Sequence, residues 1–406
     1  MLISRRGWLS ITLGSPFVAA AQGGRAGVME TRISRIIHEF ERQGFHRTGT
    51  TVDRLSGDWL CGEVRRAGLV PVREPFSLNR VDPVTNVLIA GDRRIKGVPL
   101  FDGAFTGADG IRGRLGPLDS DAEIGLAETV TNAAAAGPLG DARRKNRHKA
   151  LVCVTLGERP GLCPSNADLF LQPFGPPVLQ VSSEDAPWLS EQAQRSVEVQ
   201  LIARATRRPA SAVNVTATIK GADLALPPLV IMTPRSGWYA CASERGGGIA
   251  CWIETMWALS TARPSRTILF VASSGHELGH LGINAFVDRR PGIVARTAGW
   301  MHLGANIGAA TGPGNILQAS DDEFEGTLIR AMTASGLSVQ QRVTRGTIPR
   351  GEAEVVHRGG GRYVSIIGRN ALFHNPADLG PQAVSPDAIA KFIASFIAVA
   401  RMLAAA

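Results

Sequence analysis

The residues best suited to chemistry gather in one short segment of the chain, SSGHELGHLG, residues 273–282. Within it, His276, Glu277 and His280 spell HExxH, in which two histidines one helical turn apart bind zinc and the glutamate activates water. The same glutamate could instead bind a metal at the end of a strand, with other partners. The two interpretations predict different folds and different ligands.

The residues around the motif disfavour the helical zinc-protease interpretation. His276 follows the apolar run TILFVASS and a glycine, so it is expected at a strand-to-helix corner rather than inside a helix. A third ligand is also missing, because Ile283 and Phe286 occupy the last two positions of HExxHxxGxxH. No glutamate lies between Glu277 and Glu323 to replace it. We therefore expect His276 at the strand end and His280 in the first helical turn, so that the two histidines need not share an ion.

The elements that must position this corner alternate between strand and helix. Apolar runs predict strands at 84–91, 212–221, 227–233, 266–275 and 298–309, and helical periodicity predicts helices at 52–70, 247–260, 280–290 and from Ser385 onward. This alternation predicts an α/β fold with a doubly wound, mostly parallel sheet.

A different composition interrupts that pattern between residues 96 and 211. Gly and Pro become frequent there, and short strand-like runs occur at 150–157, 176–182 and 196–203. We predict one α/β domain built from residues 22–95 and 212–406, with residues 96–211 as a β-rich insertion.

The N-terminus is typical of an export signal. Ser4-Arg5-Arg6-Gly7-Trp8-Leu9 is close to the twin-arginine pattern, an apolar stretch covers Ile11–Ala21, and Ala19-Ala20-Ala21 is a small-residue cleavage site. Residues 1–21 are predicted to be removed, which leaves a periplasmic or secreted protein. No later apolar run approaches the length needed to span a bilayer, so no integral membrane segment is expected.

Composition and cysteine usage narrow the function further. Hydrophobic content of 44% and charged content of 19% are typical of a globular protein. RRKNRHK at 143–149 is the only dense basic cluster and is interpreted as a solvated loop, so no nucleic-acid function is expected. The five cysteines allow two disulfides, with Cys153/Cys163 and Cys241/Cys251 as the nearest pairs, and no CxxC occurs to build a zinc site.

The segment LFVASSGHELGHLGINAFV resembles the strand–corner–helix segment of the M28 family of zinc aminopeptidases. The resemblance extends to AVNVTATIKG, SERGGGIACWIETMWAL, HLGANIG and LFHNPADL, and so covers nearly the whole chain after the signal. HKALVCVTLG and GPPVLQVSSEDAPWL in the insertion resemble a protease-associated (PA) domain. The resemblance implies a zinc-exopeptidase fold, a zinc cofactor and a peptide or small amide substrate.

The resemblance assigns roles to four residues. The family's general-base glutamate corresponds to His276, and its ligand glutamate to Glu277. Its metal-bridging aspartate corresponds to Glu244, and its terminal histidine ligand to His374. Histidine can act as a general base near neutral pH.

At three other positions this chain lacks the side chains that the family uses at its metal site. Where the family has His-x-Asp after its first core strand, this chain has Pro234-Arg235-Ser236, and the acidic residue of the third strand corresponds to Ala305. Neither proline nor alanine offers a ligand atom. The family's paired zinc site therefore cannot form, and we expect at most one zinc per chain, held by Glu277, His374 and Glu244 with His276 or His280 completing the shell.

Accessory roles remain open for several neighbours of these residues. His280 and His302 could serve the site or be structural hydrogen-bonding residues. Arg235 and Arg245 could pair with Glu244 in a buried network that replaces the missing metal charge. Ser236 could act as a nucleophile.

Two functions follow from these residues. The first is an exported M28-like hydrolase of peptide or amide bonds with an altered, at most mononuclear metal site. The alternative is a catalytically inactive protein that keeps the peptidase fold and cleft to bind a ligand.

Overall fold

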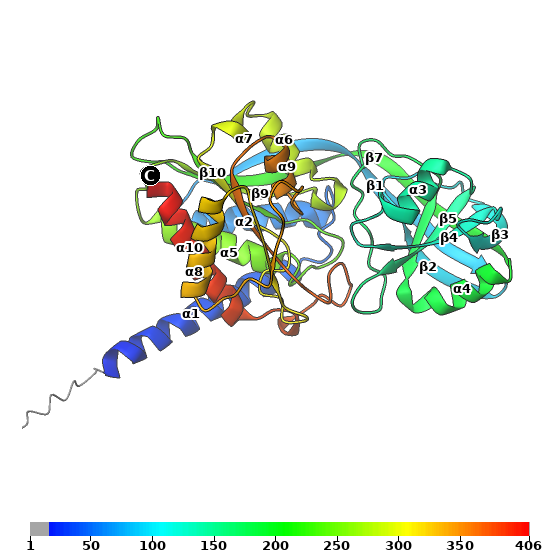
Figure 1. Ribbon diagram of the computed structural model, residues 1–406, viewed down its shortest axis with the longest axis horizontal. Helices are drawn as coiled ribbons and strands as arrows, with labels where there is room; N and C mark the ends of the chain where they lie inside the picture. Colours follow the sequence, from blue (N-terminus) through cyan, green and yellow to red (C-terminus); the bar gives the residue numbers. More distant parts are fainter. Residues whose placement is uncertain (1–15, 406) are drawn as a thin grey trace, which may run out of the picture.

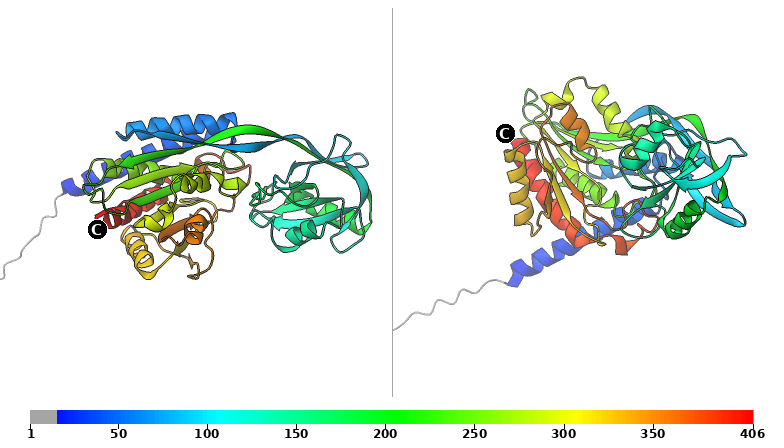
Figure 2. Two further views of the ribbon diagram at one scale, coloured as in Figure 1. Left: turned by 90° about the horizontal axis from the view of Figure 1, so that it is seen from above. Right: turned by 45° about the vertical axis from the view of Figure 1, so that its right-hand side comes forward.

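The chain forms two lobes joined by a long two-stranded ribbon (Figure 1, Figure 2). The computed structural model describes the backbone of residues 16–405 and the side chains of residues 27–405. The ribbon consists of β1 (Val72–Ala90) and β7 (Glu198–Ile219), which pair antiparallel along almost their full length. Because both strands run from one lobe into the other, they set where the second lobe lies.

The main lobe contains the doubly wound sheet that the alternation predicts. Its strand order is β7-β9-β8-β10-β13-β11-β12. The central strands β9, β8, β10 and β13 are parallel, and β7 and β11 border them antiparallel. The bounds are β8 (Leu229–Pro234), β9 (Ile268–Ser273), β10 (Gly299–Leu303), β11 (Asn315–Ala319), β12 (Gln341–Arg342) and β13 (Tyr363–Gly368).

Helices cover both faces of this sheet, which explains why its central strands are apolar on both sides. One face packs against α1 (Pro16–Glu41), α2 (Thr51–Arg66), α5 (Gly246–Ser260), α8 (Asp322–Ala334) and α10 (Pro386–Ala405). The other packs against α6 (Leu281–Asp288), α7 (Ile293–Arg296) and α9 (Ala353–Arg358). The mostly parallel α/β architecture is confirmed.

The second lobe is a smaller, β-rich unit with its own apolar core. It contains β2 (Arg93–Pro99), β3 (Ile111–Pro117), β4 (Ile124–Val130), β5 (Ala150–Leu156), β6 (Val178–Ser182), α3 (Gly137–Lys145), the 3₁₀ turn η1 (Ser183–Asp185) and α4 (Ala186–Gln194). The predicted boundaries at 96 and 211 fall inside β2 and β7, and they stay predictions, as does the resemblance to a PA domain.

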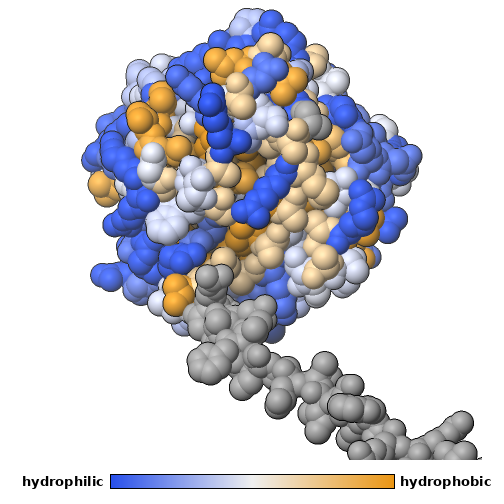
Figure 3. Space-filling view, turned by 90° about the vertical axis from the view of Figure 1, so that its left-hand side faces the viewer, coloured by the Kyte–Doolittle hydropathy of each residue, from blue (hydrophilic) through white to orange (hydrophobic). Residues whose placement is uncertain are grey.

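The expectation that no apolar run after the N-terminus is long enough to span a bilayer is wrong. Within the described chain, α10 is long and apolar enough by length and composition to cross a membrane. It contacts α1, α5 and α8, and buries Phe392, Ile393 and Phe396 in the core. Figure 3 shows the end of the molecule that carries these helices, where apolar side chains alternate with hydrophilic ones. The packing accounts for the apolar character of α10 as that of a core helix.

The predicted signal peptide is not tested by the structure, whereas the two candidate disulfides are. The predicted signal peptide, residues 1–21, lies outside the residues whose side chains are described. All five cysteines are free and buried, so neither of the nearest pairs is bonded.

A matched pair of glycine substitutions tests how tightly α6 packs behind β9. A Cβ at Gly282 would lie 2.1 Å from the Ser274 carbonyl oxygen and 2.4 Å from Asn214 Oδ1, whereas a Cβ at Gly62 in α2 meets nothing within 4 Å. Gly282→Ala should lower the free energy of unfolding by about 1–3 kcal/mol. Gly62→Ala should raise it by up to about 1 kcal/mol, because alanine favours a helix interior. Chemical denaturation of both variants measures the difference, and equal stabilities would contradict the packing.

Candidate functional site

The chain turns a sharp corner after β9 and does not continue directly into a helix. Gly275 has φ 85°, His276 begins the single 3₁₀ turn η2 (His276–Leu278), and Gly279 and His280 have φ 74° and 61° before α6 starts. The rings of His276 and His280 lie 4.9 Å apart at an interplanar angle of 47°. His280 therefore precedes the helix, one position earlier than predicted. HExxH does not lie within one helix, which confirms that the helical zinc-protease interpretation fails.

The carboxylate of Glu277 is buried and held by protein donors. Thr48 donates to its Oε1 from both the backbone N–H (2.8 Å) and the hydroxyl (2.7 Å), and the Ser236 hydroxyl donates to its Oε2 (2.7 Å). Burial raises the pKa of Glu277, and these hydrogen bonds oppose the rise. Ser236 is therefore a donor to Glu277, a role that the sequence did not suggest.

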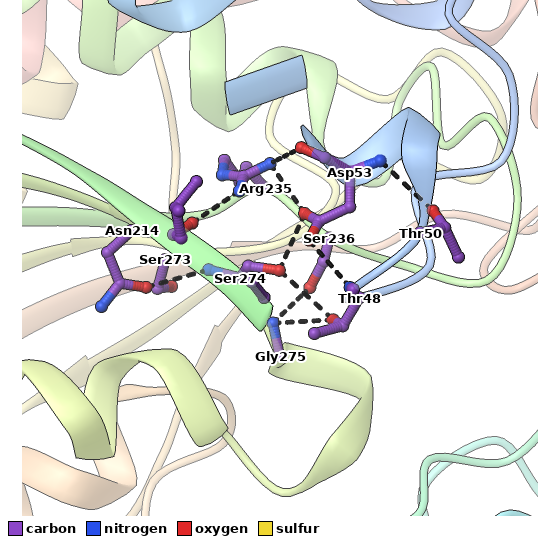
Figure 4. Close-up of polar contacts among 12 residues, drawn as sticks. Thr48, Thr50, Asp53, Asn214, Arg235, Ser236, Ser273, Ser274 and Gly275 are labelled. Atoms are coloured by element: carbon purple, nitrogen blue, oxygen red, sulfur yellow. Dashed lines mark hydrogen bonds and ion pairs between the residues drawn. The ribbon is translucent and has the colours of Figure 1, made fainter. Parts of the chain in front are cut away.

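The same hydroxyl groups hold the corner itself (Figure 4). The backbone N–H of Gly275 donates to the hydroxyl oxygens of Thr48 (2.9 Å) and Ser236 (2.8 Å). Behind them, Arg235 pairs with Asp53 at 2.8 Å, and both side chains are buried. Arg235 thus pairs with an aspartate, not with Glu244 as one alternative predicted, and its contacts are those of a supporting residue.

Glu244 forms the predicted ion pair with a different arginine. Its Oε1 lies 2.8 Å from Nη2 of Arg245, whose Nε donates to the Ser236 carbonyl oxygen (2.6 Å). Oε1 also lies 3.5 Å from Nε2 of His374. Nδ1–H of His374 donates to the Pro164 carbonyl oxygen at 2.6 Å, so Nε2 carries the lone pair.

These residues do not fit the zinc site that the resemblance implies. Glu244 and His374 direct two acceptor atoms toward each other, which two metal ligands would do. However, the Arg245 cation lies beside them, and the Glu277 oxygens accept from Thr48 and Ser236 instead. Within residues 27–405, no three His, Cys, Asp or Glu side chains are grouped as metal ligands. The metal-binding role of Glu277, His374 and Glu244 stays a prediction.

A cleft of about 490 Å³ lies between the two lobes. On the main lobe it is lined by His276, His280 and His302, together with Ala305, and on the second lobe by Asn132, Glu158, Asn166 and Asp168. The cleft therefore collects three of the predicted site histidines. Its lining does not include Glu277, Glu244 or His374.

The three cleft histidines are held in the neutral state. Burial lowers the pKa of His276 well below its ordinary value, and lowers those of His280 and His302 to about 4 and about 3. The positive charge of Arg245 lowers all three pKa values further. Neutral imidazoles can accept a proton or bind a ligand by a lone pair.

Glu352 is a site residue that sequence reasoning missed. It directly precedes α9 and is buried, with Oε1 3.7 Å from Nδ1 of His276. The Ser273 hydroxyl at the end of β9 lies 2.6 Å and 2.7 Å from its two oxygens. Burial raises the pKa of Glu352 to about 7. No motif surrounds it in RGEAEVVH, so only the arrangement of α9 over β9 reveals it.

The placement predicted for Glu277 and His374 is partly wrong. Glu277 follows β9 and His374 follows β13, so both lie beyond the carboxyl ends of strands. However, β8 and β10 separate these strands, which are not neighbours. The Glu277 carboxylate accepts from Thr48 and Ser236, whereas the His374 ring donates to the Pro164 carbonyl oxygen. The two side chains therefore bond to different partners.

Comparison with solved structures identifies this architecture. A zinc aminopeptidase from Bacillus subtilis superposes with a TM-score of 0.76 at 17% identity, covering 94% of this chain and 95% of that one. The peptidase M28 precursor from Shewanella amazonensis gives 0.72 at 16% identity, covering 95% and 97%. The chain has the fold of the M28 aminopeptidases.

A third solved structure is also similar to this chain, that of an aminopeptidase from Aneurinibacillus sp. strain AM-1. Its TM-score is 0.69 at 15% identity, and 94% of each chain is covered. No protein-family model and no curated protein sequence matches the chain. At identities this low the likeness establishes the fold, while the chemistry of the site rests on this chain's own residues.

The raised pKa of Glu352 predicts a pH-dependent stability. Its folded pKa of about 7 lies above the ordinary value of 4.5, so the unfolded chain loses this proton first as the pH rises. The contribution of Glu352 to stability should therefore decrease between pH 4.5 and 7, by about 1.4 kcal/mol for each unit. Glu352→Gln should remove this decrease. Denaturation of both proteins at several pH values measures it, and a difference that is constant with pH would contradict the assignment.

Proposed function

We propose that this M28-fold chain is an exported hydrolase of peptide or small amide bonds whose cleft uses histidine instead of the paired zinc site. One observation carries the proposal: His276 lies beyond the carboxyl end of β9, lines the interlobe cleft, and has a buried carboxylate, Glu352, 3.7 Å behind its Nδ1. Ligand sites of open α/β sheets lie at this edge. The names of the similar structures, aminopeptidase and peptidase, support peptides as the substrate class.

The chemistry follows from the state of the imidazole. A neutral His276 accepts a proton from a water molecule as the water oxygen attacks the amide carbonyl carbon. The imidazolium that forms lies next to the Glu352 carboxylate, which stabilises its charge. The same proton then passes to the departing amine as the C–N bond breaks, and His276 returns to its neutral state.

The metal content is part of the proposal. Glu244 and His374 supply two acceptor atoms 3.5 Å apart, and two ligands rarely hold zinc tightly. The Arg245 guanidinium beside them repels a second cation. We therefore propose at most one zinc per chain, and every step above is assigned to the chain's own residues.

The proposed general base predicts a loss of turnover without a loss of binding. His276→Gln should lower kcat for peptide hydrolysis by about 10²–10⁴-fold, the range typical of general-base removal. Peptide affinity should change little, because the cleft keeps its other lining residues. A mass-spectrometric assay on a mixed peptide library, with titration calorimetry, measures both quantities.

The control for this experiment is His38→Gln, an exposed histidine of α1 that does not line the cleft. It should leave turnover unchanged. Equal turnover in His276→Gln and the control would refute the role of His276. Saturable peptide binding without turnover in the unmodified protein would instead favour the alternative, a non-catalytic peptide-binding protein.

The metal prediction is a stoichiometry. Elemental analysis of protein purified without chelator should find no more than one zinc per chain. Replacing His374 by alanine should remove any bound zinc, while His302→Ala should remove little of it. Two zinc ions per chain would contradict the loss of the ligand positions at Pro234, Ser236 and Ala305.

Export rests on the N-terminal sequence. Replacing Arg5 and Arg6 with lysine should leave the precursor in the cytoplasm, because the twin-arginine pair is the recognised feature. Cell fractionation followed by immunoblotting checks this, and unchanged export would refute the signal assignment.

A further inference from the structure

A second hollow of about 520 Å³ lies on the other side of a segment that borders the cleft. Pro164 lines this hollow, whereas Asn166 and Asp168, a few residues further along, line the cleft. The two hollows share no lining residue. The second one is therefore a separate candidate site, outside the chemistry assigned above.

A cation without a partner lines this hollow. Among the contacts of residues 27–405, the Arg47 guanidinium takes part in no ion pair and no side-chain hydrogen bond, although Arg47 is only partly exposed. Its nearest aromatic partner is Phe101, with the ring centroid 5.4 Å from Cζ. By contrast, Arg80 in the same hollow is paired with Asp82 at 2.7 Å. Burial lowers the pKa of Arg47, and the charges of Glu277 and Asp82, neither of which forms an ion pair with it, oppose the lowering.

Aromatic side chains form the walls around this cation. Phe45 and Tyr239 pack edge to face with centroids 5.3 Å apart, and Trp238, which precedes Tyr239 in the chain, also lines the hollow. Phe45 is 56% exposed, so its ring is accessible to a ligand. The rings offer flat apolar surfaces to a ligand.

The start of α2 adds a second source of positive potential. Thr50, Thr51 and Val52 line the hollow, and Thr50 is the N-cap of this 16-residue helix. The backbone N–H groups of Thr51 and Val52 have no acceptor in the part of the chain that the structure describes. Free N–H groups in a first helical turn favour an anion.

We propose that this hollow binds a small carboxylate that carries an aromatic group. The carboxylate pairs with Arg47 near the start of α2, and the ring lies among Phe45, Trp238 and Tyr239. A guanidinium bonds a carboxylate through two parallel N–H groups, which gives the contact strength and direction. This site does not depend on the function proposed for the cleft.

The experiment uses phenylacetate as the probe and phenylacetamide as its neutral analogue. Calorimetric titration of the full mature chain should give saturable phenylacetate binding, with phenylacetamide at least about tenfold weaker because it lacks the charge. Arg47→Gln should weaken phenylacetate by a similar factor. The control, Arg42→Gln, changes an exposed arginine that lies outside the hollow, and should bind as the unmodified protein does.

A second measurement locates the ligand. Phenylacetate should shift the backbone N–H resonance of Val52 in protein isotope-labelled on valine, which is assigned as the signal that disappears in Val52→Ile; Val52 lines this hollow and not the cleft. This readout on the unmodified protein keeps the test valid if Arg47→Gln folds poorly. Absence of saturable binding, equal affinity in Arg47→Gln, or binding that leaves the Val52 signal unmoved would each overturn the proposal.

Discussion

A buried guanidinium, that of Arg245, governs the electrostatics of the candidate site. It is held between the carboxylate of Glu244 and the carbonyl oxygen of Ser236. A buried permanent charge is stable only beside such partners. The carboxylate of Glu244 is therefore engaged in the ion pair with Arg245. Burial lowers the pKa of His276, His280, His302 and His374, and the charge of Arg245 lowers each of them further. Burial and this one cation together keep the cleft histidines neutral.

The second lobe contributes to the same site through hydrogen bonds to the main lobe. The Ala167 N–H donates to the Glu277 carbonyl oxygen (2.9 Å), Trp238 Nε1 donates to Asn166 Oδ1 (3.2 Å), and the Tyr239 hydroxyl donates to the Leu162 carbonyl oxygen (2.9 Å). These contacts, together with the β1–β7 ribbon, fix the position of residues 164–168, the segment that lies between the cleft and the hollow around Arg47. The position of the second lobe thus decides the shape of both hollows.

The chain has the M28 fold, and the polar groups at the edge of its sheet are bonded to one another. Glu277 keeps its place after β9, but its oxygens accept from Thr48 and Ser236. A buried carboxylate needs such hydrogen-bond donors. The main-lobe sheet is stabilised independently of these polar contacts, because its strands bury apolar side chains on both faces.

The sequence by itself determined the sheet, the corner at His276 and the absence of ligand atoms at Pro234 and Ala305. These are local properties: apolar periodicity, a glycine after a buried strand, and side chains without ligand atoms at Pro234 and Ala305. Tertiary structure alone decided which groups meet. Thr48 reaches Glu277 across 229 residues of chain, and Glu352 reaches Ser273 across 79. No periodicity encodes such pairs, because they depend on how helices and the second lobe pack over the strand ends and on which donor a buried charge finds there.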